Sequence, residues 1–177
     1  MIIPEEVIRL VEPFDFKTIY ELGNKNTYGT PYREYYKEKN IDYISIDING
    51  RDGALKLDLI KPIDMPPRDM VTNIGVTEHV IKQKPVFENI HNLSYYRMVH
   101  WAPLTMSING HHGLWRYERR FFTLFASINN YKINKSFILE RPNLLTILCI
   151  DFSKQNTEPF KWDDNFDRMI HRTRRKI

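Results

Sequence analysis

Short apolar runs rich in β-branched and aromatic residues alternate along this chain with stretches whose apolar residues have helical spacing. The runs that predict strands cover residues 16–22, 42–47, 54–58, 69–73, 96–101, 136–140 and 144–152. Helices are expected over residues 30–39, 85–93 and 114–128. Strands that alternate with helices predict an α/β fold, with a mostly parallel seven-stranded sheet and helices on both faces. Because a short turn joins the last two strands, the C-terminal strand is expected to be antiparallel.

The chain of 177 residues, 42% hydrophobic and 27% charged, contains no linker or repeat that would divide it. We expect one domain over residues 1–177, with a core at about 14–152 and a basic tail at about 160–177. No secretion signal or apolar run of about 20 residues is visible, which argues against a membrane protein. The only cysteine, Cys149, lies in an apolar run, so a buried thiol in a reducing cytoplasm is expected.

The formal net charge of +4 is unevenly distributed. Four cations gather near the end of the chain: Arg172, Arg174, Arg175 and Lys176. A basic tail of this kind is usually solvated, and its functional interpretation is attraction to a polyanion. The tail therefore keeps a nucleic acid as a less favoured partner, and an oligomer is compatible with the sequence.

Polar residues and glycine follow the first three predicted strands. Gly23 permits a sharp turn after the first strand, and Asn24 and Thr27 offer hydrogen bonds beside a helix start that favours anions. Asp47 ends the second strand, where an acid can accept the hydroxyls of a ribose, and Asp58 ends the third. In open α/β sheets the ligand lies beyond the carboxyl ends of the strands, so we expect these groups to share one site.

Four segments resemble the ordered motifs of class I (Rossmann-like) S-adenosylmethionine-dependent methyltransferases. They are Glu21-Leu-Gly23, residues 44–48, Leu55-Lys-Leu-Asp58 and residues 69–79. The resemblance spans roughly residues 16–152 and implies a methyltransferase with S-adenosylmethionine as its cofactor. It implies a cofactor site made of Glu21, Gly23, Asn24, Thr27, Asp47, Ile48, Asp58, Asn73 and Gly75. In this resemblance Asp58 lies near the adenine, and Asn73 and Gly75 lie where the family lines the methyl-transfer site.

The first motif differs from the family pattern, because residues 24–28 carry no glycine where the family has one or two more. This difference keeps open a catalytically inactive binding or assembly module, and a lyase acting on the same cofactor is a more distant alternative. Neither the glycine spacing of a dinucleotide-binding loop nor a phosphate-binding P-loop is present, which argues against nicotinamide enzymes and nucleoside triphosphatases.

The acceptor side is expected in the two loops that follow the fourth and fifth strands. Glu78 and His79 are the candidate catalytic residues, because an oxygen or nitrogen nucleophile needs a base. Trp101, His111 and His112 are candidate substrate-binding residues. No metal is expected, since adjacent histidines need a third fixed ligand to hold one. The Asn/Asp-Pro-Pro-aromatic motif of base amino-methyltransferases is absent, so we expect a small polar metabolite or a sugar as acceptor.

Overall fold

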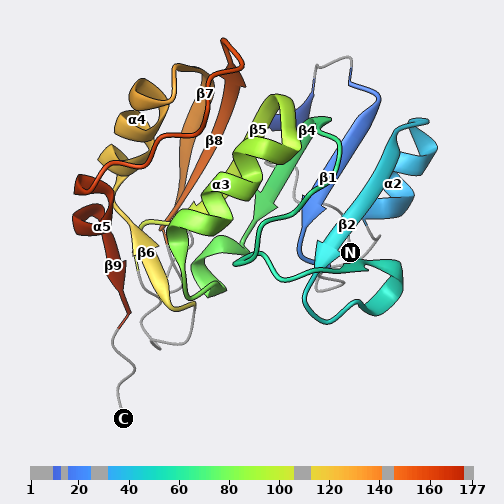
Figure 1. The fold of residues 1–177 in the computed structure, drawn as a ribbon, viewed down its shortest axis with the longest axis horizontal. Coiled ribbons are helices and arrows are strands. Elements are labelled where there is room, and N and C mark those ends of the chain that lie inside the picture. The colour runs from blue at the N-terminus through green and yellow to red at the C-terminus, as the bar shows by residue number, and fades with distance from the viewer. Residues whose placement is uncertain (1–9, 13–15, 25–31, 106–112, 141–145, 174–177) are drawn as a thin grey trace.

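The computed structural model describes residues 10–12, 16–24, 32–105, 113–140 and 146–173. Its centre is a seven-stranded sheet in the order β3-β2-β1-β4-β5-β8-β7 (Figure 1). The strands are β1 (Thr18–Leu22), β2 (Asp42–Asp47), β3 (Leu55–Lys56), β4 (Arg68–Ile74), β5 (Ser94–Pro103), β7 (Tyr131–Glu140) and β8 (Thr146–Lys154). The predicted seven-stranded α/β sheet is thereby confirmed.

Strand direction follows the prediction as well. β1 pairs in parallel with β2 on one side and β4 on the other, and β5 is parallel to β4. β8 runs antiparallel between β5 and β7, so the expected antiparallel C-terminal strand is confirmed. Because β1, β2 and β4 are parallel neighbours, their carboxyl ends meet at one edge of the sheet.

Helices cover both faces of the sheet. They are α2 (Tyr32–Glu38), α3 (Gln83–Leu93), α4 (Arg119–Ile128) and α5 (Asn165–Met169). The larger apolar cluster contains Tyr20 together with residues of α3, α4 and α5, including Phe87 and Phe125. The smaller cluster contains Ile19 and Tyr36 of α2. Neighbouring residues of a strand point to opposite sides, so the two clusters lie on opposite faces of the sheet.

Residues 115–117 differ from the prediction of one helix over residues 114–128. They form β6 (Trp115–Tyr117), which pairs antiparallel with β9 (Ile170–Arg172), and helix α4 begins only at Arg119. The physical reason is the burial of alternate residues, since Trp115 packs against the larger cluster and Tyr117 is fully buried. Part of the expected basic tail is therefore structured, because α5 and β9 lie within it.

Candidate functional site

The loop after β1 begins with a glycine that the geometry requires. Gly23 has φ +83°, a left-handed conformation that other residues rarely adopt. A Cβ atom at this position would lie 2.6 Å from Cγ2 of Val76, in the loop after β4. The Gly23 N–H donates to the carbonyl of Ile46 at 2.7 Å. Gly23 therefore brings the ends of β1, β2 and β4 into close contact.

Asp47 fastens two loops to this edge. One carboxylate oxygen accepts the backbone N–H of Asn24 at 3.0 Å, and the other accepts the N–H of Asn49 at 2.9 Å. The Asn24 side chain in turn donates to the carbonyl of Arg51. Each carboxylate oxygen has a second acceptor site, so the half-exposed Asp47 can still accept hydroxyl groups.

Ile48 and Asp58 lie beside Asp47. Ile48 is 66% exposed, so its side chain is open to a ligand at this edge. Asp58 lies two residues beyond β3, where its Oδ1 accepts the N–H of Ile60 at 3.1 Å. The Leu57 N–H donates to the Asp47 carbonyl at 3.3 Å, which brings the predicted ribose and adenine acids to the same part of the edge.

Glu21 lies below this edge, on the face of the sheet that α2 covers. Its side chain is only 4% exposed and accepts a hydrogen bond from the Tyr43 hydroxyl. Burial raises the pKa of Glu21 to about 8, although the Tyr43 hydrogen bond and the charge of Arg33 oppose the rise. The carboxyl group is consequently protonated for the most part at neutral pH.

Asn73 and Gly75 connect β4 to the turn that follows it. Asn73 is fully buried, donates to the Thr77 hydroxyl at 2.9 Å and accepts the Thr77 N–H at 3.1 Å. Its amide nitrogen also lies 3.1 Å from Nδ1 of His100. Gly75 has φ +68°, and its N–H donates to the Trp101 carbonyl. The Asn73 side chain thus bonds to protein groups, and its predicted place at the methyl-transfer site stays a prediction.

The candidate catalytic pair occupies the short 3₁₀ helix η2 (Thr77–His79). The Glu78 side chain is buried, whereas the His79 side chain is 44% exposed. His79 Nε2 lies 4.0 Å from Glu78 Oε1, so the acid is placed to stabilise a protonated imidazole. The Glu78 carbonyl accepts the Leu114 N–H at 2.6 Å, which joins η2 to the segment that leads into β6.

A buried polar network behind η2 was missed by the sequence analysis. The Tyr117 hydroxyl lies 2.9 Å from Thr77 Oγ1 and 2.7 Å from Gln83 Oε1. Gln83 donates to the carbonyls of Thr77 and Val80, and the Trp115 indole N–H donates to the Val80 carbonyl at 2.8 Å. The alternation of Trp115 and Tyr117 was the available signal, but the helical spacing of the following phenylalanines concealed it.

The predicted substrate residues are only partly placed. Trp101 is half-buried on β5 and packs against the smaller apolar cluster, on the opposite face from α3 and α4. His111, His112 and the cofactor candidate Thr27 lie outside the described residues. Within the ranges that the structure describes, no three His, Cys, Asp or Glu side chains are placed to hold a metal ion. In the same ranges no helix is long and apolar enough to cross a membrane.

Comparison with solved structures gives many matches of the same architecture. A putative S-adenosylmethionine-dependent methyltransferase from Listeria monocytogenes superposes with a TM-score of 0.64 and 13% identity, over 86% of this chain and 97% of that one. The 1,6-didemethyltoxoflavin-N1-methyltransferase of Burkholderia thailandensis, with bound S-adenosylhomocysteine, gives 0.61 and 11%, over 78% and 71%. Magnesium protoporphyrin IX methyltransferase from Synechocystis PCC 6803, also with S-adenosylhomocysteine, gives 0.59 and 9%, over 77% and 73%.

No family model and no curated protein matches the sequence. The strand order, the antiparallel β8 and these superpositions agree with one another. The chain has the Rossmann-like fold of the class I S-adenosylmethionine-dependent methyltransferases.

Proposed function

We propose that this protein is an S-adenosylmethionine-dependent methyltransferase of the cytoplasm that methylates a small polar metabolite or a sugar. The observation that carries the proposal is the joined edge of β1, β2 and β4, where Gly23 and Asp47 lie in one hydrogen-bonded unit through Ile46 and Asn24. Similar solved structures contain S-adenosylmethionine or its product S-adenosylhomocysteine, which supports the same cofactor here.

The residues at the edge fit this cofactor. Gly23 has no side chain, so the backbone of its loop can lie directly against Val76, where a Cβ atom would collide. Asp47 retains acceptor capacity for ribose hydroxyls, the exposed Ile48 offers an apolar surface for a purine, and Asp58 lies beside them. These residues, with Asn24, would hold the cofactor across the strand ends.

The bound cofactor would supply an activated methyl group on a sulfonium. The protein then has to align the acceptor and take up its proton, because the displacement itself needs alignment above all. His79 is exposed enough to meet an acceptor and carries an imidazole nitrogen that can take up the acceptor's proton. Glu78, 4.0 Å behind it, would stabilise the imidazolium that forms.

A small acceptor is supported by the amount of chain that surrounds the edge. The described segments outside the sheet and its helices are connecting loops, η2 and the β6–β9 pair, and they form no separate domain for binding a macromolecule. Two of the similar enzymes bear the names of small-molecule acceptors, 1,6-didemethyltoxoflavin and magnesium protoporphyrin IX. The exposed His79 offers hydrogen bonding of the kind that a polar acceptor requires.

Calorimetric titration with S-adenosylmethionine and S-adenosylhomocysteine tests the proposal. We expect micromolar-range binding of both by the wild type, and a loss of at least about tenfold in Asp47→Ala. Asp64→Ala is the matched control, because Asp64 is an exposed acid in the connection between β3 and β4. Failure of both ligands to bind the wild type would refute the cofactor assignment. Binding without methyl transfer to any of a panel of sugars and metabolites would instead support the inactive alternative.

A further inference from the structure

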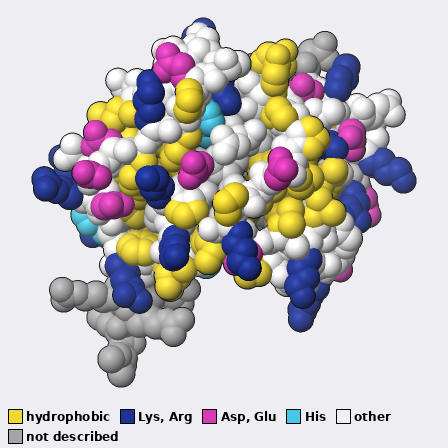
Figure 2. Space-filling view, viewed as in Figure 1, with side chains coloured by type: hydrophobic (Ala, Val, Ile, Leu, Met, Phe, Trp, Pro, Cys, Tyr) yellow, Lys and Arg dark blue, Asp and Glu magenta, His cyan; other side chains and the backbone are white. Residues whose placement is uncertain are grey.

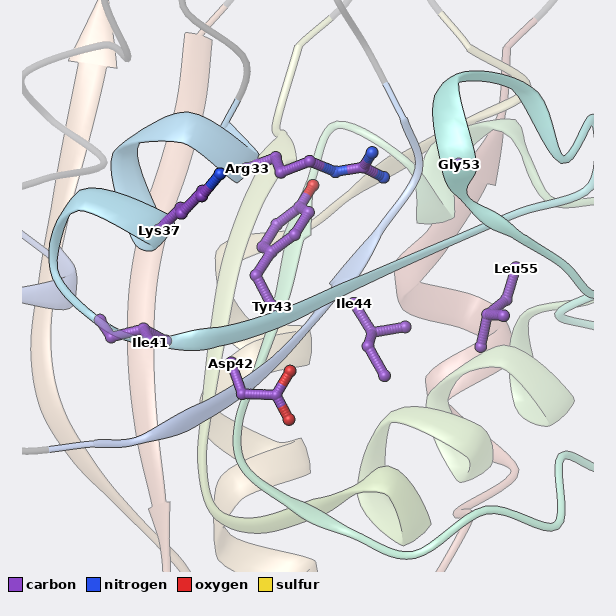
Figure 3. Close-up of a pocket in the computed structure, with 8 residues that line it drawn as sticks. All are labelled: Arg33, Lys37, Ile41, Asp42, Tyr43, Ile44, Gly53 and Leu55. Atoms are coloured by element: carbon purple, nitrogen blue, oxygen red, sulfur yellow. The ribbon is translucent and has the colours of Figure 1, made fainter.

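A groove of about 400 Å³ lies along the outer edge of β2 (Figure 3). It is lined by Arg33, Lys37, Ile41, Asp42, Tyr43, Ile44, Gly53 and Leu55. The groove exists because β3 is only two residues long and pairs with β2 only at Ile46 and Asp47. The first half of β2 therefore has no outer neighbour among the described strands.

Two cations from one side of α2 face this groove. Arg33 and Lys37 are four residues apart, so they lie on the same side of the helix, and both are exposed. Figure 3 shows the Arg33 side chain extending past the Tyr43 ring toward Gly53, with Lys37 beside α2 and pointing toward Arg33. Neither cation has an acidic ion-pair partner in the described part of the chain, and the other acids of α2, Glu34 and Glu38, do not line the groove.

The Arg33 guanidinium is held in place by its surroundings. Its central carbon lies 6.0 Å from the centre of the Tyr43 ring, within the range of a cation–π interaction. Gly53, with φ +76°, approaches so closely that a Cβ there would lie 2.7 Å from an Arg33 nitrogen. A positioned guanidinium loses less conformational entropy when it binds an anion than a mobile one does.

Among the described residues that line the groove, the one acid is already neutralised. Asp42 forms an ion pair with Arg68 at 2.8 Å, and its carbonyl accepts a second hydrogen bond from the same side chain. In Figure 3 the Asp42 carboxylate points away from Arg33 and Lys37. The groove therefore combines a positive end, where Arg33 interacts electrostatically with the mostly protonated Glu21, with an apolar part formed by Ile44 and the 39% exposed Leu55.

We propose that this groove binds a small organic phosphate, with the phosphate on Arg33 and Lys37 and an apolar or aromatic body that passes the free outer edge of β2 to reach Ile44 and Leu55 on the other face of the sheet. Guanidinium and ammonium groups together satisfy several phosphate oxygens with charge-assisted hydrogen bonds. The apolar residues favour a phosphate ester over inorganic phosphate, because only the ester removes Ile44 and Leu55 from water. None of the residues that line the groove belongs to the proposed cofactor site, and the proposal does not depend on that site.

Phenyl phosphate is the probe, with amide chemical shifts of the 15N-labelled protein as the readout. We expect saturable shifts at Gly53, Tyr43 and Ile44, with weaker binding of inorganic phosphate and none of benzyl alcohol. The double variant Arg33→Gln/Lys37→Gln should raise the dissociation constant of phenyl phosphate by at least about tenfold. The matched control is Lys132→Gln/Lys135→Gln, which removes two exposed lysines from β7 and should bind as the wild type does.

A further variant separates this site from the cofactor edge. Asp47→Ala should retain phenyl phosphate binding even where it loses S-adenosylmethionine. Equal binding by the wild type and the Arg33/Lys37 variant would overturn the proposal, as would an absence of shifts at Gly53 and Ile44. If Asp47→Ala lost phenyl phosphate binding and the Arg33/Lys37 variant kept it, the anion would bind at the strand ends. That result would also overturn the proposal.

Discussion

The carboxylate of Asp47 accepts the backbone N–H of Asn24 at 3.0 Å, and this hydrogen bond connects the loop after β1 to the end of β2. Its second oxygen accepts the N–H of Asn49 at 2.9 Å, which shapes the turn after β2. One side chain therefore organises two of the loops that the proposed cofactor would contact. The geometry of the edge and its stability depend on the same carboxylate.

Replacing Asp47 should accordingly affect stability without any ligand. Asp47→Ala removes both acceptors and should lower the free energy of unfolding by about 2 kcal/mol, since a charged acceptor contributes more than a neutral one. Asp47→Asn keeps one acceptor oxygen and should cost about 1 kcal/mol. Urea unfolding of both variants measures these losses, with Asp64→Asn as a surface control. Equal stability of all three would contradict a structural role for the carboxylate.

Gly23→Ala should destabilise the fold for two separable reasons. The positive φ of +83° costs about 1 kcal/mol for any side chain, and the added Cβ would lie 2.6 Å from Val76 Cγ2. We expect the two effects together to lower the free energy of unfolding, measured with urea, by about 2 to 3 kcal/mol. Gly75→Ala is the matched control, because its φ is +68° but its nearest contact is 3.4 Å.

A second substitution distinguishes the two causes. Adding Val76→Ala removes the colliding methyl group, so the double variant should recover the steric part of the loss but not the backbone part. An unchanged loss in the double variant, relative to Val76→Ala alone, would show that steric overlap contributes nothing.

His100 should make the protein sensitive to acid. Burial lowers its pKa from 6.5 to about 3, so the folded state stays neutral while the unfolded chain takes up a proton. The free energy of unfolding is therefore independent of this histidine's titration above pH 6.5. Below pH 6.5 it decreases by about 1.4 kcal/mol per pH unit. Between pH 6.5 and pH 4 the loss should approach about 3 kcal/mol.

His100→Phe tests this dependence, because the ring packs against Phe87, Phe122 and Phe152. The variant should show a flatter decline of unfolding free energy with falling pH, after a loss of about 1 kcal/mol at pH 7 for the Asn73 contact. A decline as steep as that of the wild type would exclude His100 as its source.

Glu21 should have the opposite effect at higher pH. Its folded pKa of about 8 lies above the ordinary 4.5, so its stabilising contribution is complete below pH 4.5 and is lost as the pH rises to 8. Glu21→Gln keeps an acceptor for Tyr43 without a charge. We expect the variant to match the wild type near pH 5 and to exceed it in thermal unfolding temperature near pH 8. A variant less stable than the wild type at pH 8 would contradict the raised pKa.

Tyr117→Phe should loosen η2 without creating a cavity. The hydroxyl lies within hydrogen-bond distance of Thr77 and Gln83, both buried, so its removal leaves a polar group unsatisfied. The expected cost is about 1 to 2 kcal/mol. Hydrogen exchange should accelerate at His79 and Val80, whose N–H groups close the turn. Tyr96→Phe, at an exposed tyrosine, should change neither quantity.

The central strands could be predicted from sequence because their apolar residues leave few alternatives. β1, β2, β4 and β5 coincide with runs that contain buried apolar residues, and the positions of Gly23 and Asp47 at the ends of two of them located the edge. β3 was harder, because its two residues are both exposed and carry little periodic signal. Asp58 was expected at the end of a strand and lies two residues beyond it.

Contacts between distant segments could not be read from the chain. Asn73 was assigned to the methyl-transfer site, whereas its hydrogen bonds to Thr77 and His100 depend on how a turn and a neighbouring strand pack. β6 forms only because β9 supplies its hydrogen-bonding partner from the far end of the sequence. Three residues of alternating Trp, Arg and Tyr do not predict such a partner.

The last described residue gives this arrangement a consequence for biosynthesis. Thr173 donates its N–H to the Leu114 carbonyl and its hydroxyl to the Gly113 carbonyl, each at 2.8 Å, while the Leu114 N–H bonds to Glu78. The segment behind Glu78 therefore obtains its final partner only after Thr173 has left the ribosome. β1, β2 and β4 can associate earlier during translation, so the nascent chain should acquire its proposed cofactor edge before the surroundings of Glu78 and His79 are complete.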